Sequence, residues 1–329
     1  MTAIILLNWN GCDDTLACLE SLSAVKGDDF YVVVADNGST DDSVNRLIDW
    51  GGKQTFYSFC KVAEREGQEM SSPSAGACIL YTLSQNYGFA KGNNLAIELV
   101  SRFHPDHYLV LNNDTEVEPD FLQQLALFQT QYPQYEVLSP LISLYSPKGI
   151  IWNCGGRLFA GFRKYYYAGK PVSAVKESSH IPVSFITGCA LYFSPRVLDE
   201  QGQLFTERFF FGEEDFAFSL RMQREGVGMA CVVASRIYHK VGRSTSKLKR
   251  NDKRFVYFLN RYIDVRLHYS SLFFNLWSGV YSLYIVLLLL KAGTSVKETC
   301  NFIRRLHADS RRYDGVTREM YMELMGIKR

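Results

Sequence analysis

The chain has 329 residues, 47% of them hydrophobic, which is enough apolar material for one large folded domain with a smaller appendage. Its 36 basic and 34 acidic side chains leave a net charge of +2, which argues against a nucleic-acid partner held by global charge. The eight cysteines form no CxxC pair, which argues against a zinc cluster or a disulfide scaffold and indicates a reducing compartment.

The first part of the chain alternates apolar strands with amphipathic helices. Residues 3–8 form a continuous apolar run, which is typical of a first strand covered on both faces rather than of a signal peptide. A helix capped by Asp13 or Asp14 should follow. Residues 30–35 repeat the strand, and a second helix should begin near Asp41. This alternation predicts a parallel sheet with right-handed crossovers.

The next segments continue this plan. They are a polar surface insertion at 51–76, a strand at 77–84, a turn at 86–94, a helix at 95–103, a strand at 107–114, and a helix that begins at Glu118-Pro119. The strands predicted so far run into polar loops that begin at Asn8, Asp36, Asn86 and Asn112. Open parallel sheets bind ligands beyond the carboxyl ends of their strands, so these loops predict a binding site at that edge.

The second part of the chain has a different pattern. Residues 150–195 consist of short apolar runs between Gly turns, which predicts extra strands that add to the sheet and build a wall beside the site. A helix should begin at about Glu213 and stop at Gly226, and residues 229–240 should form a strand. Beyond Gly242 the chain becomes basic and helical.

Three groups of side chains could carry chemistry. Asp114 follows a buried strand and could hold a divalent cation, although an acid there also suits a turn or a helix cap. Glu213, Glu214 and Asp215 open a helix, where acids favour the helix dipole, but three of them exceed what capping needs, and one could act as a base. His239 could complete a metal site or be a structural histidine.

Several motifs together resemble family 2 inverting glycosyltransferases of the GT-A fold, and most closely the bacterial rhamnosyltransferase-like branch. In family order across residues 3–244 they are IILLNWNG, VVVADNGSTDDS, NYGFAKGNN, YLVLNNDTEV, ITGCALYF, FFFGEEDFAFSLRMQREG and RIYHKVGRS. The resemblance implies an α/β fold, Rossmann-like, in which helices flank a mainly parallel sheet. We expect the catalytic domain over 1–242 and a helical C-terminal region over 243–329.

The resemblance also implies roles for individual residues. Asn112-Asn113-Asp114 matches the family's Asp-x-Asp element, with Asp114 as the direct ligand of Mg²⁺ or Mn²⁺ and His239 as a second ligand. Asp215 matches the catalytic base, and Glu214 is the alternative because the alignment is ambiguous by one position. The remaining residues are Asp36 on the nucleobase, Asn8, Asn86, Lys91, Asn112 and Asn113 around the nucleotide sugar, and Trp152, Gly188 and Glu213 on the acceptor side.

The expected reaction moves one sugar from a nucleotide donor to a saccharide acceptor of bacterial surface polysaccharide, such as O-antigen or capsule. The first donor to consider is dTDP-rhamnose, followed by a UDP-hexose or a UDP-N-acetylhexosamine. A sugar-phosphate nucleotidyltransferase is an alternative, but it would usually carry a Gly-rich basic loop that NWNGCDDTLACLE lacks. A non-catalytic scaffold is a second alternative, which the intact Asp114, Asp215 and His239 disfavour.

The run 269–290 has no charged side chain and is long enough to span a bilayer. It could equally lie on the inner leaflet, pack inside the protein or serve a dimer. Basic residues flank it: Arg254, Arg261 and Arg266 before, and Lys291, Arg304, Arg305, Arg311 and Arg312 after. These cations favour anionic lipid, so we expect a cytoplasmic protein peripheral to the inner face of the membrane, with an acceptor that could be lipid-linked.

Overall fold

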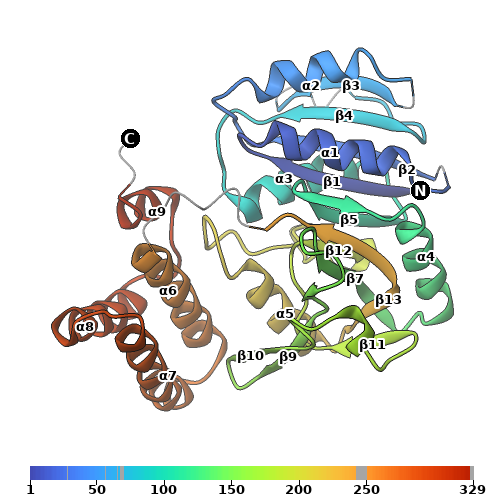
Figure 1. The fold of residues 1–329 in the computed structure, drawn as a ribbon. Helices are drawn as coiled ribbons and strands as arrows, with labels where there is room; N and C mark the ends of the chain where they lie inside the picture. Colours follow the sequence, from blue (N-terminus) through green and yellow to red (C-terminus); the bar gives the residue numbers. More distant parts are fainter. Residues whose placement is uncertain (28, 56, 65, 67–69, 242–249, 327–329) are drawn as a thin grey trace. The chain divides into compact units, whose positions relative to one another are not determined.

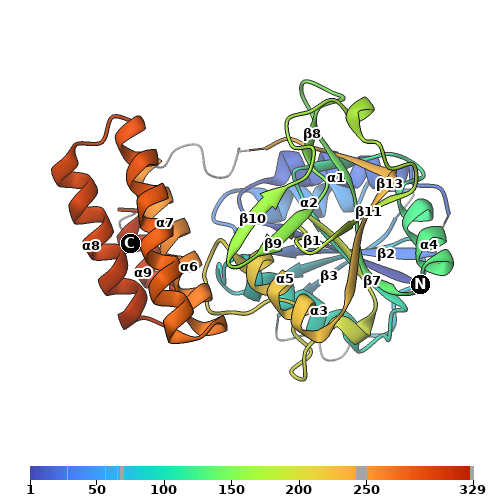
Figure 2. The same cartoon turned by 90° about the horizontal axis from the view of Figure 1, so that it is seen from below.

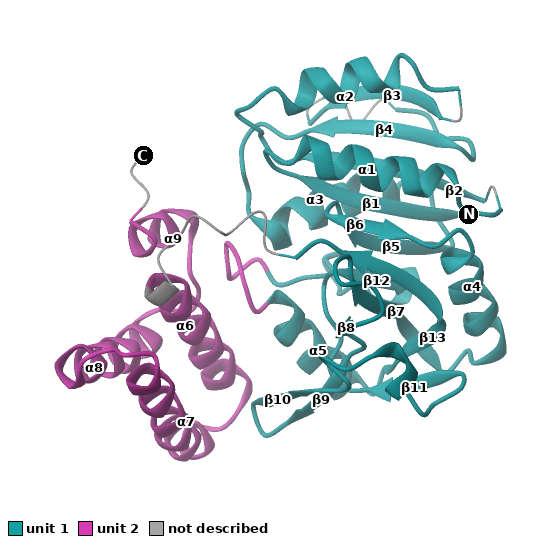
Figure 3. Cartoon of the chain, viewed as in Figure 1, with its two compact units in different colours: residues 1–206, 214–244 teal, residues 207–213, 245–329 magenta. Residues whose placement is uncertain are grey.

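The computed structural model describes residues 1–326 except 28, 56, 65, 67–69 and 242–249, and it divides into two compact units (Figure 1). Unit 1 comprises residues 1–206 and 214–244, and unit 2 comprises 207–213 and 245–329 (Figure 3). The domain boundary expected at 242/243 lies outside the described residues.

Unit 1 is built on one large, mainly parallel sheet. Its strand order is β11-β13-β7-β12-β5-β1-β2-β4-β3, with β6 paired to β13 and β8 paired to β7. The strands are β1 (Thr2–Asn8), β2 (Phe30–Asp36), β3 (Ser58–Ala63), β4 (Ala77–Thr82), β5 (His107–Asn112), β6 (Thr115–Val117), β7 (Tyr135–Leu144), β8 (Ile151–Asn153), β11 (His180–Val183), β12 (Ala190–Phe193) and β13 (Gly228–His239). The five strands β1 to β5 run parallel, which confirms the predicted crossover plan.

Helices cover both faces of this sheet. They are α1 (Cys12–Ser23), α2 (Ser43–Gly51), α3 (Phe89–Ser101), α4 (Phe121–Gln131) and α5 (Glu214–Glu225). Apolar side chains of α1, α2 and α4 share one buried cluster with Ile4 and Leu6 of β1, whereas those of α3 and α5 share the other with Ala3 and Ile5. Figure 2 shows α1 and α2 on one side of the strands and α3 and α5 on the other. The result is a three-layer α/β/α fold, as expected from strands that are apolar on both faces.

The insertion expected at 51–76 contains a strand. β3 pairs in parallel with β4 at the edge of the sheet, and most of its side chains remain at least partly accessible to solvent. An edge strand needs no continuous apolar run, because only part of it is covered. β3 therefore lacks the continuous apolar run that predicts the other parallel strands.

Three helix starts differ from the sequence-based expectation. α1 has Gly11 as its N-cap, and Asp13 instead forms an exposed ion pair with Arg46 (2.6 Å). α3 begins at Phe89, inside the predicted turn, because its buried Asn94 hydrogen-bonds the backbone around Phe205 and so gains partners that a solvent-exposed turn would lack. α4 starts only at residue 121, two residues beyond the expected Pro.

The extra strands of the second part were predicted correctly for β8, β11 and β12, which join the large sheet. β9 (Gly156–Phe159) and β10 (Phe162–Tyr165) instead form a separate antiparallel hairpin. The helix expected up to Gly226 is α5, and this glycine adopts the left-handed conformation (φ 71°) that ends a helix without a steric penalty.

Unit 2 contains four helices among its described residues: α6 (Arg250–His268), α7 (Ser271–Lys291), α8 (Val296–Arg312) and α9 (Arg318–Leu324). Tyr262 of α6 lies at its centre, fully buried, with its ring 5.2 Å from the ring of Trp277 and 6.0 Å from that of Tyr281 on α7. Its hydroxyl donates to the carbonyl oxygen of Ser278 at 3.1 Å. Aromatic packing with a satisfied hydroxyl therefore holds α6 against α7.

A buried ion pair also belongs to unit 2. Arg261 of α6 pairs with Glu213, and the two side chains are 2% and 1% exposed. Removing one member of such a pair leaves the other charge buried without compensation, which costs far more than losing a surface pair.

We therefore expect Arg261→Met to lower the free energy of unfolding by about 3–5 kcal/mol. The exposed pair of Arg46 with Asp13 provides the control, and Arg46→Met should leave the unfolding midpoint nearly unchanged. Denaturant unfolding followed by far-ultraviolet circular dichroism measures both. Equal midpoints for the two variants would show that the buried pair does not stabilise the fold.

Thiol reactivity tests the packing of both units. Cys60 and Cys300 are exposed, whereas the other six cysteines are buried. Burial raises the pKa of Cys18, Cys78 and Cys154 to about 12, so these groups stay protonated and unreactive at pH 8. A maleimide should modify two thiols in the native protein and eight after denaturation, as counted by intact mass. Rapid native labelling of Cys18 would contradict the packing.

Candidate functional site

The carboxyl ends of β1 and β2 are joined by a buried polar network. Asn8 pairs in register with Asp36, and the Asn8 side-chain amide donates to the Asp36 carboxylate at 2.7 Å. The Asn8 side-chain carbonyl accepts from the Thr15 hydroxyl at 2.8 Å, and Asn113 donates to the same hydroxyl at 2.8 Å. The structure thus brings together Asn8, Asp36 and Asn113, three residues expected to bind the nucleotide sugar.

A second network ties the β4 loop to this edge. Asn37, which follows β2, donates to the side-chain oxygen of Asn86 at 3.1 Å and to the carbonyl of Gly88 at 3.0 Å. Three residues further on, Lys91 lies in the first turn of α3, with its ammonium 5.5 Å from the centre of the Tyr87 ring. Asn86 and Lys91 therefore lie on a loop and a helix start that are fixed to the end of β2.

Asp114 and His239 meet although 125 positions separate them in the sequence. The turn between β5 and β6 carries Asp114, and antiparallel pairing of β6 with β13 aligns Thr115 with His239. The His239 Nε2 atom lies 3.0 Å from an Asp114 carboxylate oxygen. Both side chains are largely shielded, with 8% and 13% of their surfaces exposed. The partial shielding strengthens their electrostatic interaction relative to bulk water.

Trp152 of β8 packs against His239. Its ring lies 4.3 Å from the His239 ring in an edge-on arrangement. The His239 Nδ1 atom is buried and has no hydrogen-bond partner among the described residues. The carboxylate oxygen is a ligand that Mg²⁺ and Mn²⁺ both prefer, and an imidazole nitrogen suits transition-metal ions, so this donor set fits a divalent cation, and Mn²⁺ better than Mg²⁺. No group of three or more His, Cys, Asp or Glu side chains gathers anywhere in the described part of the chain, so this site offers a pair of protein donors.

Lys240, the residue after His239, lies between acids. Its ammonium is 2.9 Å from Glu116 and 3.5 Å from Asp14. Burial alone would lower the pKa of Lys240, but the hydrogen bond and charge of Glu116, supported by Asp14, raise it above the ordinary value. This lysine therefore stays charged beside the Asp114 turn.

The acids before and within α5 lie in different surroundings. Glu213 is paired with Arg261 in unit 2, as described above, and Glu214 is buried at the start of α5. Asp215 keeps 24% of its side chain exposed and lies 3.5 Å from a guanidinium nitrogen of Arg163 on β10. Of the three acids, Asp215 is therefore the most accessible to a substrate.

Hydrogen bonds of the loop 186–189 link the start of α5 to the end of β5. Ser219, one turn after Asp215, accepts a hydrogen bond from the backbone nitrogen of Ile186 at 3.2 Å and donates to the Asp215 carbonyl at 2.7 Å. Three residues after Ile186, the carbonyl of Cys189 accepts from the Asn112 backbone nitrogen at 2.8 Å. The loop 186–189 therefore bridges the acid-bearing helix and the strand that precedes Asp114.

Gly188 lies in this loop and is buried. A side chain there would begin 3.4 Å from the ring of Phe89, in ordinary contact distance. The position is therefore enclosed by the ring of Phe89 at the start of α3 and by the ring of Phe205.

Two residues of this region were not anticipated. Trp9 follows β1 and is 48% exposed, which is unusual for a tryptophan and places an aromatic surface at the sheet edge. Its signal in the sequence was an indole within a polar strand-end loop. Arg163, the partner of Asp215, had no signal, because the hairpin that carries it could not be located from short apolar runs.

The family model for Glycosyl transferase family group 2 matches residues 107–306, more than half of the chain. This segment includes Asp114, Trp152, Asp215 and His239. No curated protein matches the chain at a significant level.

Solved structures support the fold. The mannosyltransferase PcManGT from Pyrobaculum calidifontis, in complex with GDP-Man and Mn²⁺, superposes with a TM-score of 0.54 and 12% identity over 99% of this chain and 85% of its own. Residues 1–349 of S. aureus TarS give 0.50 and 13% over 94% and 91%. GalNAc-T7 with UDP, GalNAc and Mn²⁺ gives 0.51 and 12% over 73% of this chain.

This chain spans 43% of the GalNAc-T7 chain and 39% of the longer TarS structure. Likeness at such low identity concerns the fold, and it confirms the predicted GT-A arrangement of a mainly parallel sheet between helices. The family match is independent of these superpositions. On that match, the chain belongs to glycosyl transferase family group 2.

Proposed function

We propose that the protein is an inverting, metal-dependent glycosyltransferase that moves one sugar from a nucleotide diphosphate donor to a saccharide hydroxyl. The observation that carries the proposal is the meeting of Asp114 and His239 at 3.0 Å, at the edge where the β1, β2 and β5 loops gather. Two protein ligands leave coordination positions for diphosphate oxygens and water, which is how Mg²⁺ is usually held beside phosphates. A bound divalent cation would stabilise negative charge on the leaving diphosphate.

The nucleotide part of the donor is assigned to the network of Asn8, Asp36 and Asn113. Asn8 and Asp36 are buried and hydrogen-bonded to each other, and Asn113 is tied to Asn8 through the Thr15 hydroxyl, so their positions are fixed before a ligand arrives. Asp36 is proposed to contact the nucleobase, and the exposed Trp9, which follows β1 at the same sheet edge, is proposed to offer the base a flat surface. Lys91 and Asn86 are proposed to flank the phosphates and the ribose.

Asp215 is proposed as the catalytic base, with Glu214 as the alternative. In the transfer, the acceptor oxygen forms a bond to the anomeric carbon while the bond from that carbon to the diphosphate oxygen breaks. The hydroxyl proton passes to the Asp215 carboxylate, and attack opposite the leaving group inverts the anomeric centre. The greater exposure of Asp215 favours it over the buried Glu214, because a base must reach the acceptor hydroxyl.

Arg163 can orient the Asp215 carboxylate. The guanidinium lies 3.5 Å from the carboxylate and stacks on the Phe185 ring, with its centre 4.6 Å from the ring centre. Trp152 and Gly188 are proposed to form the acceptor side. Trp152 lies next to His239, and Gly188 lies on the loop 186–189, which is hydrogen-bonded to both α5 and β5. Glu213 was expected there too, but its pairing with Arg261 gives it a stabilising role in unit 2.

Saccharide transfer to a surface polysaccharide, with dTDP-rhamnose as donor, remains the first hypothesis for the substrate. UDP-hexoses and UDP-N-acetylhexosamines come next, since TarS residues 1–349 were crystallised with UDP-GlcNAc and GalNAc-T7 with UDP. Calorimetric titration of each nucleotide sugar, with and without Mn²⁺, identifies the donor. A donor that binds only with the metal is the expected result.

For Asp215→Asn we expect transfer to fall by at least about 100-fold, because a positioned base contributes roughly 10²–10⁴-fold, while donor affinity changes little. Glu214→Gln should retain most of the activity if its side chain only starts the helix. Initial rates with the identified donor, together with calorimetric donor binding, measure both. Near-normal turnover of Asp215→Asn would refute the base assignment.

Asp114→Asn and His239→Ala should each weaken Mn²⁺ binding, measured by calorimetry in the presence of a nucleoside diphosphate. Loss of an outer-shell partner costs about 10–100-fold in metal affinity, so loss of a direct ligand should cost at least as much. Asp13→Asn is the control, because Asp13 is exposed and pairs only with Arg46 in the described contacts. Unchanged Mn²⁺ affinity in both site variants would exclude this pair as the metal site.

A further inference from the structure

The outer face of α7 is an uninterrupted apolar stripe. The leucine stripe consists of Leu272, Leu276, Val280, Leu283 and Leu287, whose side chains are between 61% and 72% exposed. Their spacing of three or four residues places them along one face of the helix. The helix has no charged side chain before Lys291.

The opposite face of α7 is already used. Phe274, Trp277, Tyr281, Ile285 and Leu289 are buried within unit 2. α7 is also the one helix in the described part of the chain that is long and apolar enough to cross a membrane, and a third of its most apolar window is buried. With one face packed against α6 and α8, the helix is better suited to lie in a membrane surface than to span it.

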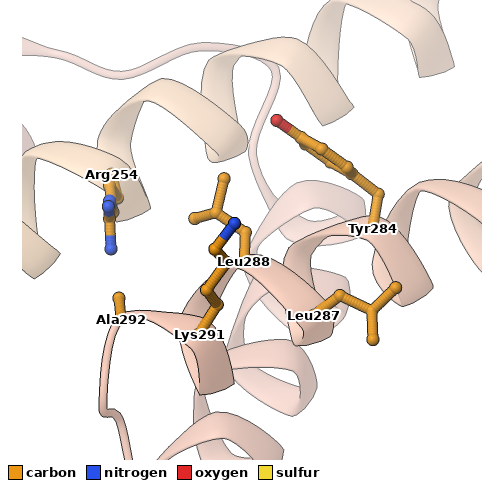
Figure 4. Close-up of a pocket in the computed structure, with 6 residues that line it drawn as sticks. All are labelled: Arg254, Tyr284, Leu287, Leu288, Lys291 and Ala292. Atoms are coloured by element: carbon orange, nitrogen blue, oxygen red, sulfur yellow. The ribbon is translucent and has the colours of Figure 1, made fainter.

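A basic pocket of about 500 Å³ opens beside the C-terminal end of the leucine stripe. It is lined by Arg254 of α6 and, on and just after α7, by Tyr284, Leu287, Leu288, Lys291 and Ala292 (Figure 4). Two cations and no acid line it, and Leu287 belongs to both the pocket and the stripe. The Arg254 Nη1 atom is buried and has no hydrogen-bond partner among the described residues.

A buried guanidinium nitrogen without a partner is costly unless an acceptor meets it. Arginine binds phosphate oxygens with charge-assisted hydrogen bonds, and Lys291 can add a second positive charge. The leucine stripe ends beside these two cations, because Leu287 belongs to both the stripe and the pocket. The combination of a cationic pocket with a continuous hydrocarbon-like surface matches a molecule with a phosphate head and acyl chains.

We propose that unit 2 docks on a membrane by laying the leucine stripe of α7 among acyl chains, while the basic pocket binds the phosphate headgroup of an anionic lipid. The face of α7 has no acid, so a second copy of this chain would bring the same cations and no complementary charge to Arg254 and Lys291. Anionic lipid supplies that charge. The surface does not depend on the proposed transfer reaction, since the residues proposed for that reaction belong to unit 1.

Flotation of the full chain with vesicles tests this docking. One set of vesicles contains phosphatidylcholine alone, and the other contains phosphatidylcholine with phosphatidylglycerol. We expect the chain to prefer the anionic vesicles by about tenfold or more, because each Lys or Arg at an anionic surface contributes on the order of 1 kcal/mol.

Two variants separate the parts of the surface. Arg254→Gln with Lys291→Gln should abolish the preference for phosphatidylglycerol, and Leu276→Ser with Leu283→Ser should abolish binding to both vesicles. A matched control in unit 1 changes the exposed residues Lys53→Gln and Leu127→Ser and should bind like the unmodified chain. Thermal unfolding verifies that every variant remains folded, since all the stripe residues changed are exposed.

The proposal is overturned if the unmodified chain floats with neither vesicle, or if the pocket and stripe variants bind as the control does. Sedimentation velocity without vesicles tests the other possible occupant of the stripe, a second copy of this chain. A dimer that the stripe variant converts to monomer, together with no vesicle binding, would assign the stripe to a second copy of this chain. These readouts need no sugar donor, so they stay independent of whether the transfer reaction is confirmed.

Discussion

The parallel register of β1 with its neighbours β2 and β5 is the constraint on which the site depends. It aligns Asn8 with Asp36 on one side and Leu7 with Asn112 on the other, so both strand ends meet at one edge. A one-residue slip would turn each side chain to the opposite face of the sheet and disrupt both apolar layers. The buried hydrogen bond of Asn8 with Asp36 fixes the same register from the polar side, because misaligned partners would be buried unsatisfied.

The second requirement is met by β13, which lies far away in the sequence. β13 runs in parallel beside β7 and also pairs with the short β6, and this second pairing brings His239 to the turn that carries Asp114. Asp114 and His239 can meet only when β6, β13 and the turn between β5 and β6 are all in place. The residues of the proposed metal site are therefore a property of the complete sheet, and the Trp152 ring on β8 restricts the volume around them.

Much of the fold could be predicted because the buried strands carry their own signal. The continuous apolar runs of β1, β2, β4 and β5 require cover on both faces, and the polar residues that follow them indicate Asn8, Asp36 and Asp114 as site residues. β3 was not predicted, because an edge strand is half solvated and carries no continuous apolar run. The start of α3 was not predicted, because tertiary hydrogen bonds of Asn94 outweigh the low helix propensity of asparagine. The partnership of Asp215 with Arg163 depends on a hairpin whose position only the three-dimensional packing determines.

The central claim is that Asp114 and His239 together hold the divalent cation of the donor site. Anomalous diffraction at the manganese edge, from crystals of the full chain grown with Mn²⁺ and a nucleoside diphosphate, tests it most directly. The account predicts one strong anomalous peak in contact with both side chains, with the diphosphate bound to the same ion. A nucleotide bound with no manganese at this pair, or manganese bound elsewhere in unit 1, would contradict it.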